Sequence, residues 1–201
     1  MRGRDPVALA RVMDGCPIAG LSVVTEPIDF GGDIGIITRV RPVVGVPILC
    51  KDFHKEVCDI KAAAAAGTDA VLLTVCMLDD GQVTELHSAA GRLGLETLVE
   101  VHSVEDLQRV VRLGIEPDIL GINNRDIIVR ETDDGNVSLT ERLAPYVPAG
   151  TLLLSESSIQ GPDDARRARD AGADAVLVGT SILGAADTAT AINDLVEVGW
   201  R

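Results

Sequence analysis

The sequence predicts an α/β protein of the (β/α)8 TIM-barrel type. Its short strands are apolar throughout, each is followed by a helix, and the strand ends recur about every 25 residues. Apolar strands without alternation are typical of parallel strands covered on both faces, and regular strand–helix alternation requires a parallel sheet with right-handed crossovers. An open doubly wound sheet would repeat in the same way, but no Gly-x-Gly-x-x-Gly loop follows the first strand here.

The elements follow from apolar runs bounded by helix starts and stops. Pro6 suits the first turn of the opening helix, and Ser103 with Asp106 resembles a capping box. Glycines at the C′ position end four helices: Gly67, Gly94, Gly114 and Gly172. The predicted helices are 5–14, 33–40, 55–66, 79–93, 103–114, 139–143, 162–171 and 187–198. The predicted strands are 21–25, 47–50, 70–75, 96–99, 118–122, 151–154 and 175–178.

An internal repeat supports the barrel. The segment from Gly67 to Leu72 recurs from Gly172 to Leu177, and a weaker copy starts at Gly114. The two clear copies lie four strand–helix units apart, which is half of an eight-unit barrel. The chain opens on a helix, however, so seven strands are predicted in place of eight and the barrel is expected to be incomplete. Residues 1–201 are expected to form a single domain.

Composition limits the partners and the compartment. The net charge of −13 argues against nucleic acid or an anionic membrane as the main partner, although it allows a small anionic substrate. No apolar run is long enough to span a membrane and no signal peptide opens the chain, so we expect a cytoplasmic protein. The cysteines lack zinc-like spacing and are predicted to be reduced, mostly buried thiols, with a catalytic cysteine as the alternative: Cys16, Cys50, Cys58 and Cys76.

Polar residues end several strands, and active sites of such barrels lie at the carboxyl ends of the strands. Lys51 and Glu100 follow alternate strands and would face one end of the barrel. A buried lysine–glutamate pair is either a general acid and base or a structural ion pair. Ser157-Ser158 and Gly179-Thr180 end the last two strands, where backbone N–H groups either bind a phosphate or simply cap helices.

The cluster from Asn123 to Asp126 follows another apolar strand. Asn123 would orient a substrate, and Arg125 would pair either with a substrate carboxylate or with Asp126. The loop residue His102 is predicted to be solvated, and His87 to lie on a helix surface. We predict no metal site, because Asp79-Asp80 is best interpreted as a helix cap.

These motifs together resemble the indole-3-glycerol phosphate synthase family, and the similarity covers nearly the whole chain. The matching segments are Leu21–Glu26 with Phe30–Gly32, Pro47–Phe53, Leu98–His102, Gly121–Asp126, Ser155–Ile159 and Asp174–Ser181. Lys51-Asp52-Phe53 and the run Gly121–Asp126 are the most specific of them.

The resemblance implies closure of an indole ring on 1-(2-carboxyphenylamino)-1-deoxyribulose 5-phosphate, with loss of carbon dioxide and water. Lys51 would be the general acid that protonates the substrate ketone, and Glu100 the carboxylate that assists dehydration. The resemblance assigns substrate positioning to Asn123, Arg125, Glu156 and Ser157, and phosphate binding to Ser158, Gly179 and Thr180. It implies no metal and no organic cofactor.

Departures from the family leave alternatives open. The family's first-strand motif Glu-x-Lys-x-x-Ser-Pro-Ser is absent, and Ser158 stands where the family has glycine. The loop of residues 127–137 is longer and more acidic than is usual in the family, and His54–Cys58 replaces the segment that the family usually has at that position. The missing strand would be explained by a start upstream, by a homodimer that covers the open seam, or by a divergent homologue in a specialised indole or anthranilate pathway. A non-catalytic phosphate-ligand-binding or scaffold barrel and a phosphosugar isomerase are the rival functions.

Overall fold

The computed structural model describes residues 4–125 and 136–200, in two compact units that are presented separately: Met1–Leu98 and Val99–Arg201. The first unit contains α1 (Pro6–Asp14), β1 (Leu21–Val24), α2 (Gly35–Val40), η1 (Arg41–Val43), β2 (Ile48–Lys51), α3 (Val57–Ala66), β3 (Ala70–Thr74), η2 (Val75–Met77) and α4 (Asp80–Arg92). β4 (Glu96–Val101) crosses the boundary. The second unit continues with α5 (Val104–Arg112), β5 (Ile119–Asn123), α6 (Ser138–Leu143), η3 (Ala144–Tyr146), β6 (Leu152–Glu156), α7 (Pro162–Ala171), β7 (Ala175–Leu177), α8 (Thr180–Gly184) and α9 (Thr188–Val196).

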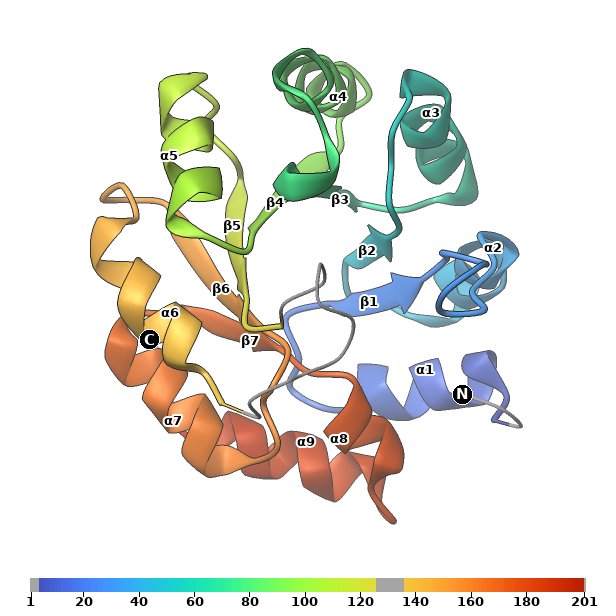
Figure 1. The fold of residues 1–201 in the computed structure, drawn as a ribbon. Helices are drawn as coiled ribbons and strands as arrows, with labels where there is room; N and C mark the ends of the chain where they lie inside the picture. Colours follow the sequence, from blue (N-terminus) through green and yellow to red (C-terminus); the bar gives the residue numbers. More distant parts are fainter. Residues whose placement is uncertain (1–3, 126–135, 201) are drawn as a thin grey trace. The chain divides into compact units, whose positions relative to one another are not determined.

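Each unit is built on parallel strands in sequence order. In the first unit β1 pairs with β2 and β2 with β3, and in the second β5 pairs with β6 and β6 with β7. Helices α3 and α4 lie on one face of the first unit's strands, and α5, α6 and α7 lie on one face of the second unit's strands (Figure 1). The described residues thus confirm the predicted alternation and the seven predicted strands.

Burial follows the position of each strand in its unit. Every residue of β3 is buried, because this strand has a neighbouring strand and covering helices. β1, the first strand in the order, pairs with β2 and is largely half-buried, and β7, the last, pairs with β6 and is half-buried as well. These apolar but half-covered strands are the sheet edges that a protein normally has to cover.

The internal repeat has a structural counterpart in each unit. Gly67 and Gly172 end α3 and α7 with φ of +93° and +117°, a backbone conformation that favours glycine. Two residues later, Asp69 accepts a hydrogen bond from the Ile48 N–H at 2.7 Å, and its own N–H donates to the Ile48 carbonyl at 2.9 Å. Asp174 makes the same two hydrogen bonds to Leu153, at 2.9 and 2.8 Å. The repeated motif therefore fastens the start of one strand to its predecessor.

Two local predictions were wrong. The short helix α8 was not predicted as a helix, because its five residues are too few to show helical periodicity. β4 runs on to Val101, so Glu100 lies inside the strand and not after it. Asp126 and most of the 127–137 segment fall outside the described residues. In the described part of the chain, no helix combines the length and apolar character that crossing a membrane requires.

Candidate active site

Lys51 is the last residue of β2 and is half-buried at its carboxyl end. The next side chain, Asp52, accepts a hydrogen bond from the Thr25 hydroxyl at 2.7 Å and one from the Phe53 N–H at 2.8 Å. The Thr25 N–H donates to the Lys51 carbonyl at 3.0 Å. Two hydrogen bonds from Thr25 therefore link the end of β1 to the Lys51 carbonyl and to Asp52, which restricts the backbone that carries the Lys51 amine.

Glu26 organises the loop that follows β1. Its carboxylate is 6% exposed and accepts hydrogen bonds from the backbone N–H groups of Ile28, Asp29 and Phe30 at 2.9, 2.7 and 2.9 Å. Burial acts to raise the pKa of Glu26, but these three donors outweigh burial and hold its pKa below the ordinary value. This carboxylate is accordingly an ionised structural cap.

The loop brings an aromatic ring to the strand ends. The Phe30 and Phe53 ring centroids lie 6.2 Å apart with a 54° angle between the rings, and these are the only two phenylalanines in the sequence. Gly32 allows the loop to fold this way, since a Cβ there would lie 2.5 Å from the Val24 carbonyl oxygen. An apolar ring surface thus stands two residues beyond Lys51.

Cys50, the cysteine next to Lys51, is unsuited to a catalytic role. Cys50 is 1% exposed, and burial raises the pKa of its thiol to about 11, with the charge of Asp52 adding to the shift. Such a thiol is protonated at neutral pH and is a poor nucleophile. His54 is directed elsewhere: its Nδ1 lies 2.9 Å from the Leu72 carbonyl oxygen, so this nitrogen carries the proton and donates. All four cysteines are free, but only Cys50 is buried, so the prediction of mostly buried thiols was wrong.

In the second unit, β4 and β5 bring two predicted site residues together. The Asn123 Nδ2 donates to the Glu100 Oε2 at 2.9 Å, and the side chains are almost completely buried, with residue exposures of 2% for Glu100 and 6% for Asn123. A buried carboxylate requires such a donor. The Asn123 Oδ1 accepts from the Arg125 N–H at 3.0 Å, which fixes the orientation of the amide.

His102 approaches the other oxygen of the same carboxylate. Its Nε2 lies 3.6 Å from the Glu100 Oε1, an ion-pair distance when the imidazole is protonated, and its side chain is only 8% exposed. The prediction that His102 is solvated was therefore wrong. The turn after β4 holds it there, because the His102 N–H donates to Asp106 at 3.0 Å and Ser103 accepts from the Asp106 N–H at 3.0 Å. Such a turn cannot be recognised from a single loop histidine.

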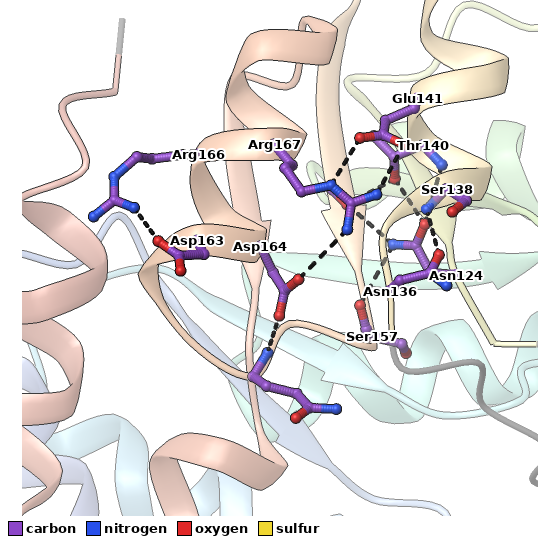
Figure 2. Close-up of polar contacts among 12 residues, drawn as sticks. Asn124, Asn136, Ser138, Thr140, Glu141, Ser157, Asp163, Asp164, Arg166 and Arg167 are labelled. Atoms are coloured by element: carbon purple, nitrogen blue, oxygen red, sulfur yellow. Dashed lines mark hydrogen bonds and ion pairs between the residues drawn. The ribbon is translucent and has the colours of Figure 1, made fainter.

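Asn124 is a residue that the sequence analysis did not single out. Its side chain joins the ends of β5 and β6 to α6, and Figure 2 shows it between Thr140 and Ser157. The amide nitrogen donates to the Ser155 hydroxyl and to the carbonyls of Glu156 and Ser157 at 3.1, 2.8 and 3.4 Å. The amide oxygen accepts from the N–H and the hydroxyl of Thr140 at 3.0 and 3.1 Å.

The turn after β6 contains the predicted serines. Ser157 and Ser158 have φ of +62° and +58°, in the left-handed region that non-glycine residues rarely adopt. Ser158 stands where the family has glycine, and it adopts positive φ here without being glycine. The preceding Glu156 is completely buried at the end of β6.

The turn after β7 lies against this one. The Ser181 hydroxyl donates to the Ile159 carbonyl at 3.0 Å, which joins the two turns. Gly179 and Thr180 are exposed, and a Cβ at Gly179 would meet no atom within 4 Å. The second unit thus presents open space beside the predicted phosphate residues. Lys51 lies in the first unit, so its pairing with Glu100 stays a prediction.

Each unit also has a hollow of about 460 Å³ at the opposite ends of its strands. In the first unit the hollow is lined in part by Pro47 and Glu96, and in the second by Asp118 and Thr151. These residues precede or begin their strands. The predicted acid–base residues lie at the carboxyl ends of the strands, where barrel enzymes place their chemistry, so neither hollow is the candidate active site.

Parallel strands in sequence order, each followed by a helix and with the candidate acid–base residues at their carboxyl ends, define an α/β protein of the TIM-barrel type. The sequence matches the family "Indole-3-glycerol phosphate synthase" over residues 2–195, and the chain belongs to this family. The family's activity makes it a carbon–carbon lyase of tryptophan biosynthesis.

Relatives agree with this assignment, and structural neighbours agree with the fold. The chain is 40% identical to an indole-3-glycerol phosphate synthase of Shouchella clausii, covering 95% of this chain and 73% of the relative. It is 39% identical to one of Thermococcus kodakarensis, covering 98% and 86%. Among solved structures it is similar to orotidine 5′-phosphate decarboxylase from Pyrococcus horikoshii OT3, with a TM-score of 0.72, 18% identity and coverage of 94% and 90%. A 3-hexulose-6-phosphate synthase gives a TM-score of 0.71 at 19% identity, covering 96% and 92%. Both structures support the fold alone.

Proposed function

We propose that the chain closes the indole ring of 1-(2-carboxyphenylamino)-1-deoxyribulose 5-phosphate, forming indole-3-glycerol phosphate. A ring carbon bonds to the former ketone carbon, the carboxylate leaves as carbon dioxide, and the resulting hydroxyl leaves as water. The observation that carries this proposal is the buried hydrogen bond from Asn123 to Glu100 at the carboxyl ends of β4 and β5. The relatives favour neither a specialised pathway nor a non-catalytic barrel.

Lys51 is the general acid of the proposal. Its ammonium group protonates the ketone oxygen as the ring carbon attacks, which avoids a free alkoxide. The hydrogen bonds that Thr25 makes to the Lys51 carbonyl and to Asp52 support this assignment, because they restrict the backbone that carries the amine. The proposal requires that the two units form a single domain in which Lys51 and Glu100 face the same substrate.

Glu100 assists the dehydration. Its carboxylate takes the proton that must leave as the indole double bond forms, and Asn123 orients it and stabilises its ionised form. A carboxylate whose position is fixed before the substrate binds needs little reorganisation during the reaction. No metal ion or organic cofactor enters this scheme, since the amino-substituted ring supplies the electrons and decarboxylation restores aromaticity.

The remaining residues bind the substrate in this proposal. Its aromatic ring packs on Phe30 and Phe53, the aromatic surface close to Lys51. Glu156, Ser157 and Arg125 position the chain of the substrate. Its phosphate binds at Ser158, Gly179 and Thr180, which is supported by the open space at Gly179 and by the hydrogen bond that joins the two turns.

Turnover of the synthetic substrate, followed by indole fluorescence, tests the function. We expect the wild-type chain to form product, and both Lys51→Met and Glu100→Gln to lower kcat about 100-fold or more while the substrate still binds. Cys50→Ala is the matched control within the same motif and should retain activity. Unchanged kcat in either acid–base variant would refute its assigned role.

We also propose a cytoplasmic location and a homodimer that covers exposed strand edges. The support for the dimer is the half-buried state of β1 and β7, the first and last strands in the order. Sedimentation equilibrium of the full chain tests it. A dimer is expected, and a monomer at micromolar concentration would refute it.

A further inference from the structure

We propose that Asn124 is a positioning residue that holds Ser157 and Ser158 in the left-handed conformation required for phosphate binding. This inference rests on the proposed function, in which the turn after β6 binds the substrate phosphate. Asn124 itself need not touch the substrate. Its role would be to fix the turn before the substrate arrives.

The contacts of Asn124 are directed at the start of this turn. Its backbone N–H and its side-chain nitrogen both donate to the Glu156 carbonyl, at 2.9 and 2.8 Å, and the side chain reaches on to the Ser157 carbonyl at 3.4 Å. Thr140, which is completely buried, holds the amide oxygen on the other side. The amide cannot rotate without losing hydrogen bonds on both sides.

The backbone of the turn explains why such contacts are needed. Ser157 and Ser158 are consecutive non-glycine residues with positive φ, and each carries a Cβ that disfavours this region. A strained conformation persists only where the surrounding structure imposes it. Without Asn124, we expect both serines to relax toward negative φ and to redirect the N–H groups of the turn.

The rest of the turn is held by other elements. Ser181 donates to the Ile159 carbonyl at 3.0 Å, and Asp164 accepts from the Gln160 N–H at 3.0 Å. Figure 2 shows Arg167 between Asp164 and Glu141, with hydrogen bonds to Glu141 at 2.9 and 3.0 Å. These contacts act after Ser158. The hydrogen bonds of Asn124 act earlier in the turn, on the carbonyls of Glu156 and Ser157.

This arrangement predicts a specific coupling between two positions. Glycine at position 158 removes the Cβ that opposes positive φ, so the turn should then need Asn124 less. A residue that merely stabilises the fold would show no such dependence. The combination of Asn124→Ala with Ser158→Gly thus separates positioning from general stabilisation.

The test compares four full-length proteins: wild type, Asn124→Ala, Ser158→Gly and the double variant. We expect Asn124→Ala to raise KM and the inhibition constant of inorganic phosphate about 10-fold or more, with a smaller change in kcat. Ser158→Gly in that background should restore at least half of the loss on a logarithmic scale. Asn193→Ala is the matched control, because Asn193 is an exposed asparagine on α9, outside the turn after β6.

Asn124→Asp provides a second variant if the alanine variant does not fold. It keeps the oxygen that accepts from Thr140 and replaces the nitrogen that donates to the turn, so the same loss of phosphate binding is expected. Unchanged KM and phosphate inhibition in a folded variant, or no recovery in the double variant, would overturn the inference. Direct binding of inorganic phosphate, measured by phosphorus NMR, separates this inference from the proposed function. If the wild type binds phosphate, Asn124→Ala weakens that binding and the wild type shows no turnover, only the proposed reaction is refuted. A wild type that does neither refutes both.

Discussion

Replacing Asn123 with aspartate would place a second carboxylate against Glu100 without changing side-chain size. The Nδ2 that now donates to Glu100 at 2.9 Å would become an oxygen. Two unit charges at that distance repel by about 6 kcal/mol at an effective dielectric constant near 20. Taking up one proton is cheaper, because protonating a carboxylate of ordinary pKa near 4 costs about 4 kcal/mol at pH 7. The variant should therefore be less stable than wild type by about 4 kcal/mol at pH 7, with one shared proton between the two groups.

The sign of the pH dependence follows from this proton. The pKa of the pair is raised in the folded protein, so folding holds a proton that the unfolded chain releases above about pH 4. The loss of stability should consequently shrink by about 1.4 kcal/mol for each pH unit between pH 7 and pH 5. Urea unfolding of wild type, Asn123→Asp and the uncharged control Asn123→Leu at three pH values measures this. If the difference in unfolding free energy between the Asn123→Asp variant and the wild type stayed constant with pH, the contact between Asn123 and Glu100 would be refuted.

Three further predictions test other parts of the site. Glu26 has a depressed pKa in the folded state, so it stabilises the fold above its ordinary pKa of 4.5, and this contribution is lost as the pH falls through the depressed value. Glu26→Gln should therefore weaken the dependence of the unfolding free energy on pH below that ordinary pKa. An unchanged dependence would contradict the role of Glu26 as an ionised cap of the loop after β1. His102→Leu should lower kcat about 10-fold or more with little change in KM, because it removes the imidazole beside Glu100. His102→Gln should recover most of the lost kcat, and the control His87→Leu should leave kcat unchanged. Equal kcat for His102→Leu and wild type would show that His102 is not part of the site. Gly179→Ala should change the free energy of unfolding by less than about 1 kcal/mol. It should nevertheless raise KM, because the alanine methyl group enters the open space proposed for the substrate phosphate. An unaltered KM would show that the phosphate binds elsewhere.

The sequence predicted the elements well, because the features that define them are local. Apolar runs mark the strands, and glycines such as Gly67 and Gly172 end helices with the positive φ that their position required. The repeated aspartates two residues later made equivalent hydrogen bonds in both units. Family membership also followed from local motifs, since the residues around Lys51 and Asn123 are contiguous in sequence.

What the sequence did not predict depends on contacts between distant residues. Asn124 gains its importance from Thr140 and Ser157, which lie 16 and 33 positions away. The burial of His102 depends on a turn held by Asp106. The positive φ of Ser157 could not be predicted, because no glycine stands at that position to indicate it. Such features arise when loops fold back on strand ends, and residue type alone does not determine that.

Turnover of the carboxyphenylamino sugar phosphate by the purified full chain tests the central claim most directly. The account predicts the appearance of indole fluorescence with release of carbon dioxide, and a loss of about 100-fold or more in kcat when Lys51 is replaced by methionine. A folded wild-type protein that binds this phosphorylated substrate and forms no indole would contradict it.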